Sequence, residues 1–89
     1  VDVGCGNRWL QRHVGRDDTY FGLDSVETGR ELYGARPDVH ADAAFLPLST
    51  GSVDCLALLD VLEHLERPRR ALKEAARVLR PGGRLVLSV

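Results

Sequence analysis

The sequence predicts an α/β fold in which a parallel sheet is covered by helices on both faces. The first observation is an alternation along the chain: short β-branched or aromatic stretches are followed by stretches whose apolar residues recur at helical spacing. The second is residues 53–59, an almost continuous apolar run interrupted only by Asp54. Such runs are typical of parallel strands buried on both faces. Strands that alternate with helices favour a parallel sheet.

The first half of the chain contains three expected strands. The apolar start of the chain runs directly into a glycine turn at 4–6, which indicates the end of a buried strand. Ser25 is a candidate N-cap for the second helix. The expected elements, in order, are a strand at 1–3, a helix at 9–14, a strand at 19–24, a helix or loop at 25–36 and a strand at 39–41.

The second half contains two further strands and the strongest helix signal. Pro68 suits a first helical turn, and the following residues are rich in Ala, Leu, Glu, Lys and Arg. The sequence Pro81-Gly82-Gly83 is expected to end this helix. The expected elements are a loop at 43–48, a strand at 53–59, a short helix or turn at 60–65, a helix from Pro68 to 79 and a strand at 84–89.

The bulk properties are those of one small soluble domain. The chain has 89 residues, 44% of them hydrophobic, and a net charge of −1. It carries no basic face for nucleic acid and no apolar run of the ~20 residues that a membrane span needs. Cys5 and Cys55 lack metal-ligand spacing and are interpreted as small buried residues of a cytoplasmic protein. Because the chain starts with Val1 inside a strand, residues upstream are expected to be missing.

Three features at the carboxyl ends of the expected strands point to a nucleoside. The glycine turn at 4–6 lets a ligand lie against the main chain. Asp24 follows the second strand, 22 residues after Asp2. This is close to the offset of about 20 residues for a carboxylate that accepts hydrogen bonds from ribose hydroxyls. Asp42 follows the third strand, where a carboxylate can accept from an adenine amino group. Open α/β sheets bind ligands at this edge.

Five segments, taken in order, resemble the motifs of class I S-adenosylmethionine-dependent methyltransferases. The first motif alone is weak, but the five together cover nearly the whole chain. The segments are Val1-Asp2-Val3-Gly4-Cys5-Gly6-Asn7, Phe21-Gly22-Leu23-Asp24, residues 41–48, residues 53–65 and residues 74–85.

This resemblance implies a Rossmann-like, doubly wound parallel sheet with strand order 3-2-1-4-5 in a three-layer α/β/α arrangement. It also implies a domain at 1–89 that is incomplete at both ends and lacks the family's final two strands. The implied function is transfer of a methyl group from S-adenosyl-L-methionine to a small-molecule acceptor. Nucleic acid, membrane and metal ions have no part in this expectation.

The family also implies residue roles. Gly4 and Gly6 would line the methionine part of the cofactor, Asp24 would hold the ribose, and Asp42 with the amide of Ala43 would hold the adenine. The complete set of expected cofactor contacts is Asp2, Gly4, Cys5, Gly6, Asp24, Ser25, Asp42, Ala43 and Asp60. Asp2 has an alternative role in bracing the turn through backbone amides. Asp60 and His64 are the candidates for a catalytic side chain, although the reaction requires none.

Two alternatives remain open from the sequence. The family usually has a glycine where this chain has Arg8, which either narrows the site or binds the cofactor's carboxylate. This departure favours a degenerate or truncated module that binds cofactor or scaffolds a partner without catalysis. The other alternative is a nicotinamide-dependent oxidoreductase. Trp9 disfavours it, because a dinucleotide fingerprint needs a small residue there for close helix packing.

Overall fold

The computed structural model describes residues 1–26, 34 and 36–89. The expected helix or loop at 25–36 lies largely outside these ranges. The described elements, in chain order, are strand β1 (Asp2–Val3), the 3-10 helix η1 (Trp9–His13), strands β2 (Gly22–Asp24), β3 (Val39–His40) and β4 (Val53–Leu59), the 3-10 helix η2 (Leu62–His64), helix α2 (Pro68–Val78) and strand β5 (Leu79–Ser88).

The strands form one five-stranded parallel sheet in the order β3-β2-β1-β4-β5, which confirms the predicted topology. The central strand β1 pairs with β2 through Asp2 and Gly22 and with β4 through Asp2 and Ala57. The chain runs outward to β3, then crosses back over β1 to β4. The order therefore reverses beside β1, and in open α/β sheets a ligand crevice lies at such a point.

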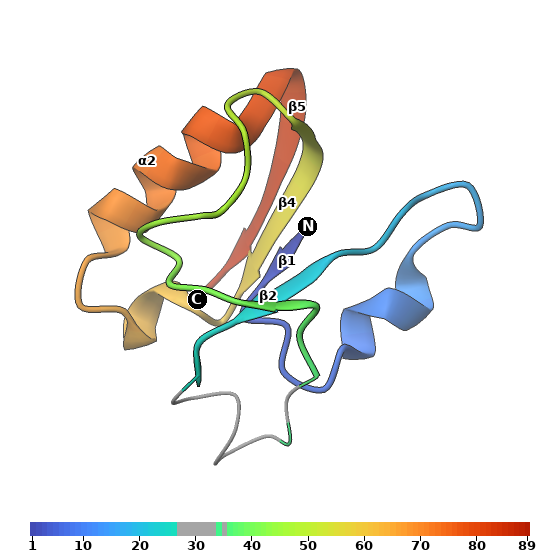
Figure 1. Ribbon diagram of the computed structural model, residues 1–89, viewed down its shortest axis with the longest axis horizontal. Helices are drawn as coiled ribbons and strands as arrows, with labels where there is room; N and C mark the ends of the chain where they lie inside the picture. Colours follow the sequence, from blue (N-terminus) through green and yellow to red (C-terminus); the bar gives the residue numbers. More distant parts are fainter. Residues whose placement is uncertain (27–33, 35) are drawn as a thin grey trace.

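Helix α2 covers one face of the sheet, and η1 lies on the other side (Figure 1). Ala71, Ala75 and Val78 recur at helical spacing and are almost fully buried. They belong to the same core cluster as Leu56 and Leu58 of β4. This packing, together with Pro68 in the first turn, explains why the segment is helical. No helix in the described ranges is long and apolar enough to cross a membrane.

The segment after β1 differs from the expected helix at 9–14. It forms the 3-10 helix η1, and none of its residues is buried. Trp9 remains 53% exposed and contacts the ring of His13, so the segment does not bury an apolar face. Most of the stability of a protein helix comes from burying an apolar face. Without that burial, a short 3-10 helix suffices to connect β1 to the next loop.

Strand β5 begins five residues earlier than expected, because Pro81-Gly82-Gly83 forms an irregularity inside it. Val53 pairs with Leu79, but Cys55 already pairs with Arg84, so the register shifts between these pairs. Gly82 has a φ of +80°. A Cβ atom on Gly83 would lie 2.9 Å from the carbonyl oxygen of Arg80. The two glycines therefore permit a bulge that sequence periodicity predicts as a helix end.

The interpretation of both cysteines as buried is half wrong. Cys5 is buried within the glycine turn, but Cys55 is exposed on β4. On the neighbouring strand β5, Val86, which pairs with Ala57, is 47% exposed. The described residues do not cover this part of the sheet, so a small apolar side chain there meets solvent.

Candidate functional site

A cavity of about 1160 Å³ lies at the carboxyl ends of the strands. Asp24 at the end of β2 and Asp42 after β3 both line it, so the two carboxylates expected to hold one nucleoside face the same space. With one exception, all residues proposed from the sequence as cofactor contacts or catalytic candidates line this cavity: Gly4, Cys5, Gly6, Asp24, Ser25, Asp42, Ala43, Asp60 and His64.

The glycine turn forms the floor of this cavity through two left-handed residues. Gly4 has a φ of +79°, and a Cβ atom there would lie 2.5 Å from Cγ2 of Val61. Gly6 has a φ of +51°, but nothing lies within 4 Å of its Cβ position. Gly4 is therefore required by close packing, whereas Gly6 leaves open space above the main chain. A ligand can approach the backbone at Gly6.

Asp24 joins the glycine turn to the end of β2. Its Oδ2 accepts a hydrogen bond from the amide of Gly6 (2.9 Å), and its Oδ1 accepts one from the amide of Ser25 (2.8 Å). The residue is only 8% exposed. A carboxylate has about four lone-pair sites, so two remain after these bonds. The backbone thus fixes a carboxylate that can still accept from two hydroxyl groups.

The loop that follows β3 presents Asp42 and the amide of Ala43. Oδ1 of Asp42 accepts from the amide of Ala44 (2.8 Å), and the Asp42 carbonyl accepts from the amide of Phe45 (2.9 Å). Among the described residues, the amide of Ala43 has no acceptor, although the residue is only 8% exposed. A donor and an acceptor therefore lie next to each other on the cavity wall, as the edge of an adenine ring requires.

Helix α2 fixes this loop through an ion pair that the sequence does not reveal. Oε1 of Glu74 accepts from the amide of Leu46 (3.2 Å), and Arg77 donates to the Leu46 carbonyl (3.0 Å). Arg77 also pairs with Glu74, and this hydrogen bond holds the pKa of Glu74 below its ordinary value. Glu74 is thus ionised at neutral pH, and its carboxylate holds the backbone of the loop at Leu46.

A second contact from α2 orients Phe45. The guanidinium of Arg70 donates to the carbonyl of Ala44 (3.2 Å) and lies 5.1 Å from the centre of the Phe45 ring. Phe45 lines the cavity and is 54% exposed. An arginine at this distance from a ring is a cation–π contact. It holds an aromatic surface beside Asp42 and Ala43.

Asp60 adopts an uncommon backbone conformation at the end of β4. Its φ is +55°, in the left-handed region that few non-glycine residues adopt. Its amide donates to the carbonyl and the hydroxyl oxygen of Ser88 (3.1 Å each), and its Oδ1 accepts from the Ser88 hydroxyl (3.0 Å). Ser88 therefore fixes the carboxylate of Asp60 at the cavity wall. No sequence motif indicated Ser88.

His64 and Cys5 differ in what they can do at this wall. His64 is exposed, and its Nε2 lies 3.8 Å from Oε1 of Glu63. Burial raises the pKa of Cys5 to about 11, so its thiol stays protonated at neutral pH and is no nucleophile. Within the ranges that the structure describes, no group of three or more His, Cys, Asp or Glu side chains is placed to hold a metal ion.

Asp2 is the exception among the expected cofactor contacts. It is 5% exposed, does not line the cavity, and accepts a hydrogen bond from the Tyr20 hydroxyl (2.5 Å). The cofactor role expected for Asp2 is therefore corrected: the side chain lies in the sheet, beneath the turn. The bracing role is corrected in detail, because the partner of its carboxylate is a tyrosine rather than backbone amides. Burial raises the pKa of Asp2, and the bond from Tyr20 opposes this.

This raised pKa predicts a pH-dependent stability. As the pH rises from 3.8, the ordinary value for this carboxyl, through the higher pKa of the folded state, the unfolded chain loses its Asp2 proton first. The free energy of unfolding should then fall. Asp2→Asn should remove the part of this fall that comes from Asp2, because asparagine does not titrate. The side-chain oxygen of the asparagine can still accept a hydrogen bond from Tyr20. Urea unfolding measures the free energy of unfolding of both proteins across this pH range. The value for Asp2→Asn, relative to that for the wild type, should grow with pH and then level off. A difference that does not change with pH contradicts the prediction.

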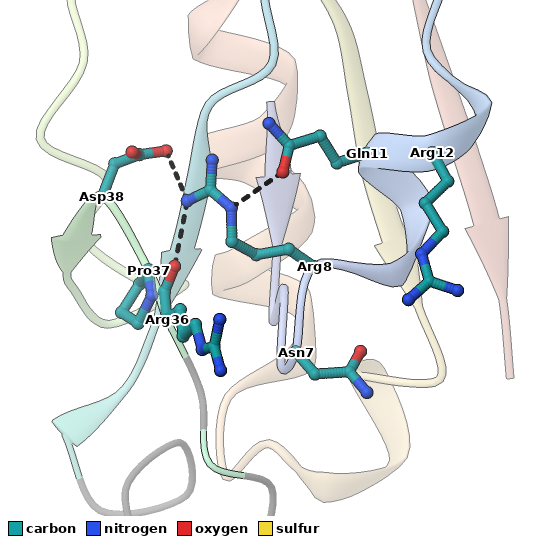
Figure 2. Close-up of a pocket in the computed structure, with 7 residues that line it drawn as sticks. All are labelled: Asn7, Arg8, Gln11, Arg12, Arg36, Pro37 and Asp38. Atoms are coloured by element: carbon teal, nitrogen blue, oxygen red, sulfur yellow. Dashed lines mark hydrogen bonds and ion pairs between the residues drawn. The ribbon is translucent and has the colours of Figure 1, made fainter.

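Arg8 points away from the cavity, so neither role considered for it from the sequence is supported. It has a φ of +65°, which explains why glycine suits this position. Its guanidinium donates to the carbonyl of Arg36 (2.9 Å), pairs with Asp38 (3.0 Å) and lies 4.7 Å from the centre of the Tyr20 ring. Figure 2 shows the contacts of Arg8 with Arg36 and Asp38. The large cavity is therefore not narrowed by this arginine.

Comparison with known proteins agrees with this geometry. Residues 1–87 match the family model described as a methyltransferase domain. The chain is 41% identical to a 37.1 kDa protein in a transposon of Streptomyces fradiae, over 98% of this chain and 28% of that protein. It is 32% identical to a ubiquinone biosynthesis O-methyltransferase of Xanthomonas oryzae pv. oryzae, over 99% of this chain and 41% of the enzyme.

Among solved structures, the chain resembles a SAM-dependent methyltransferase of Thermotoga maritima described as a possible histamine N-methyltransferase. The two are 28% identical with a TM-score of 0.77, over 99% of this chain and 42% of the other. The chain thus spans less than half the length of each of these three proteins.

Proposed function

Because the chain belongs to the family of S-adenosylmethionine-dependent methyltransferase domains, we propose that the protein transfers a methyl group to a small-molecule acceptor. One observation carries this proposal: Asp24, Asp42 and the open glycine turn at Gly6 line the same cavity. Two fixed carboxylates that follow adjacent parallel strands suit the sugar and the base of one nucleoside.

The residues present fit the cofactor at each of its three parts. Asp24 would accept from the ribose hydroxyls with the lone pairs that Gly6 and Ser25 leave unused. Asp42 would accept from the adenine amino group, while the amide of Ala43, which has no acceptor in the described chain, would donate to a ring nitrogen. The open main chain at Gly6 would accommodate the methionine part.

When bound, S-adenosylmethionine supplies a methyl group on a positively charged sulfur. This sulfur is a good leaving group. The protein therefore has mainly to align the acceptor with this methyl group, and alignment alone can contribute about 7–11 kcal/mol. Asp60, fixed by Ser88, and His64 both line the cavity and can accept a proton from an acceptor hydroxyl or amine. They are our candidates for this role.

A small-molecule acceptor is supported by the cavity and by the relatives. Pockets for small ligands typically measure about 300–1,000 Å³. The cavity here, at about 1160 Å³, is slightly larger than this range. Phe45 and Leu65 give its wall apolar surface. The ubiquinone biosynthesis enzyme with which the chain aligns is named as an O-methyltransferase, so an oxygen atom is the acceptor we propose to test first.

Calorimetric titration with S-adenosylhomocysteine tests the cofactor assignment. We expect saturable binding that a large excess of NAD does not displace. Displacement by NAD would favour an oxidoreductase, and absence of binding would contradict the cofactor site. Formation of S-adenosylhomocysteine from S-adenosylmethionine in the presence of small phenols, alcohols and amines then tests transfer. A protein that binds the cofactor but modifies none of these acceptors would contradict the proposed activity and support a binding module.

A further inference from the structure

A second cavity, of about 580 Å³, lies on the other side of the glycine turn (Figure 2). Its wall includes Asn7, Arg8, Arg12, Arg36 and Asp38. Of the residues that the structure describes, Asn7 alone lines both cavities. The two spaces are therefore neighbours with separate walls, and the cofactor proposed above does not account for the second.

The wall of this second cavity carries a surplus of positive charge. Among the described residues, it has three arginines and one aspartate, a net charge of +2. Asp38 is already committed: it pairs with Arg8 (3.0 Å) and accepts from the amide of Gly22 (2.8 Å), a bond that keeps its pKa below the ordinary value. Among the described residues, Arg12 and Arg36 have no acidic partner. The charge that remains available is thus that of two guanidinium groups.

These two groups line the same cavity, and part of its wall is fixed by backbone contacts. Figure 2 shows Arg36 and Arg12 on either side of Asn7, whereas Arg8 is turned toward Asp38. The amide of Arg36 donates to the carbonyl of Gly6 (3.2 Å), which fixes the backbone of Arg36 beside the turn. The side-chain oxygen of Asn7 accepts from the amide of Trp9 (3.2 Å), so its NH₂ group is left as a donor.

We propose that this cavity binds a phosphoryl group, through Arg12, Arg36 and Asn7. A phosphate monoester carries a charge of about −1.5 to −2 at neutral pH and three strong acceptor oxygens. This matches the surplus of +2 and lets the group accept from donors on several sides. Guanidinium groups suit it because their planar fork of N–H donors matches phosphate oxygens. A carboxylate has less charge and only two oxygens in one plane.

The site can receive this group as a free ion or as part of a larger molecule. Inorganic phosphate and phenyl phosphate serve as probes for the two sources. If the natural ligand is an ester, phenyl phosphate should bind at least as tightly as the ion, because its ring can extend through the open mouth of the cavity. If it is the ion, inorganic phosphate should bind more tightly.

The test compares two double variants that remove the same charge. Arg12→Gln/Arg36→Gln alters the cavity, whereas Arg16→Gln/Arg69→Gln removes two exposed arginines outside it. By calorimetry at low ionic strength, we expect the wild type and the second variant to bind phosphate or phenyl phosphate with similar affinity. We expect the first variant to bind at least about tenfold more weakly, the loss of one hydrogen bond between charged groups.

Two results would overturn the proposal: no saturable binding of either probe at millimolar concentrations, or equal weakening in both double variants, which would indicate a general effect of net charge. S-adenosylhomocysteine binding is measured on the same proteins. Because Arg12 and Arg36 do not line the cofactor cavity, both double variants should still bind S-adenosylhomocysteine. Failure of the phosphoryl site is therefore distinguishable from failure of the cofactor site.

Discussion

Replacing Asp24 with alanine is expected to weaken binding of S-adenosylhomocysteine by about 1.5–3 kcal/mol, the range for hydrogen bonds to a charged group. This corresponds to roughly a ten- to hundredfold higher Kd. The variant loses the proposed ribose contacts. It also loses the acceptor that holds the amide of Gly6 (2.9 Å), so the floor of the cavity is less well fixed. Calorimetry on both proteins, with circular dichroism to confirm folding, measures the change.

Asp38→Ala is the matched control for this prediction. Asp38 is also a carboxylate that accepts from a backbone amide, that of Gly22 (2.8 Å), but it does not line the cofactor cavity. Both variants should lose stability, because each leaves a backbone donor without its acceptor. Only Asp24→Ala should lose affinity for S-adenosylhomocysteine. Equal affinities for the two variants would mean that Asp24 supports the fold and does not contact the ligand.

The parts of the fold that could be predicted from the sequence are those with a local cause. The run at 53–59 is β4 because a buried parallel strand needs apolar residues on both faces. Helix α2 follows from Pro68 and from apolar residues at helical spacing. Asp24 and Asp42 could be placed at one site because the carboxyl ends of parallel strands share one edge of the sheet. In each case a short stretch of sequence contains the determining residues.

The features that escaped prediction depend on partners distant in the sequence. Ser88 fixes Asp60 from 28 residues away, and no local pattern connects them. Arg8 turns away from the cofactor cavity because Arg36 and Asp38 provide acceptors for it. Asp2 was expected at the ligand, but Tyr20, 18 residues later, holds its carboxylate beneath the turn. Such contacts exist only once the chain has folded.

Gly4→Ala is expected to cost the most stability of the substitutions considered. A residue with a side chain pays about 1–2 kcal/mol in the left-handed conformation that Gly4 adopts, at φ +79°. Its Cβ would lie 2.5 Å from Cγ2 of Val61, and overpacking of this kind costs about 1–3 kcal/mol more. The total of about 2–5 kcal/mol is large for a domain of this size, whose expected stability is roughly 5–13 kcal/mol. Urea unfolding measures the loss.

Gly6→Ala separates the cost of the backbone conformation from the cost of overpacking. Gly6 has a φ of +51°, but no atom lies within 4 Å of its Cβ position. It should pay only the backbone cost of about 1–2 kcal/mol. Its methyl group would project into the space proposed for the cofactor, so it should weaken S-adenosylhomocysteine binding.

The contact of Gly4 with Val61 can be isolated by a double-mutant cycle. Gly4→Ala should cost less stability in a Val61→Ala background than in the wild type. The same cost in both backgrounds would show that packing against Val61 is not the reason for glycine at this position.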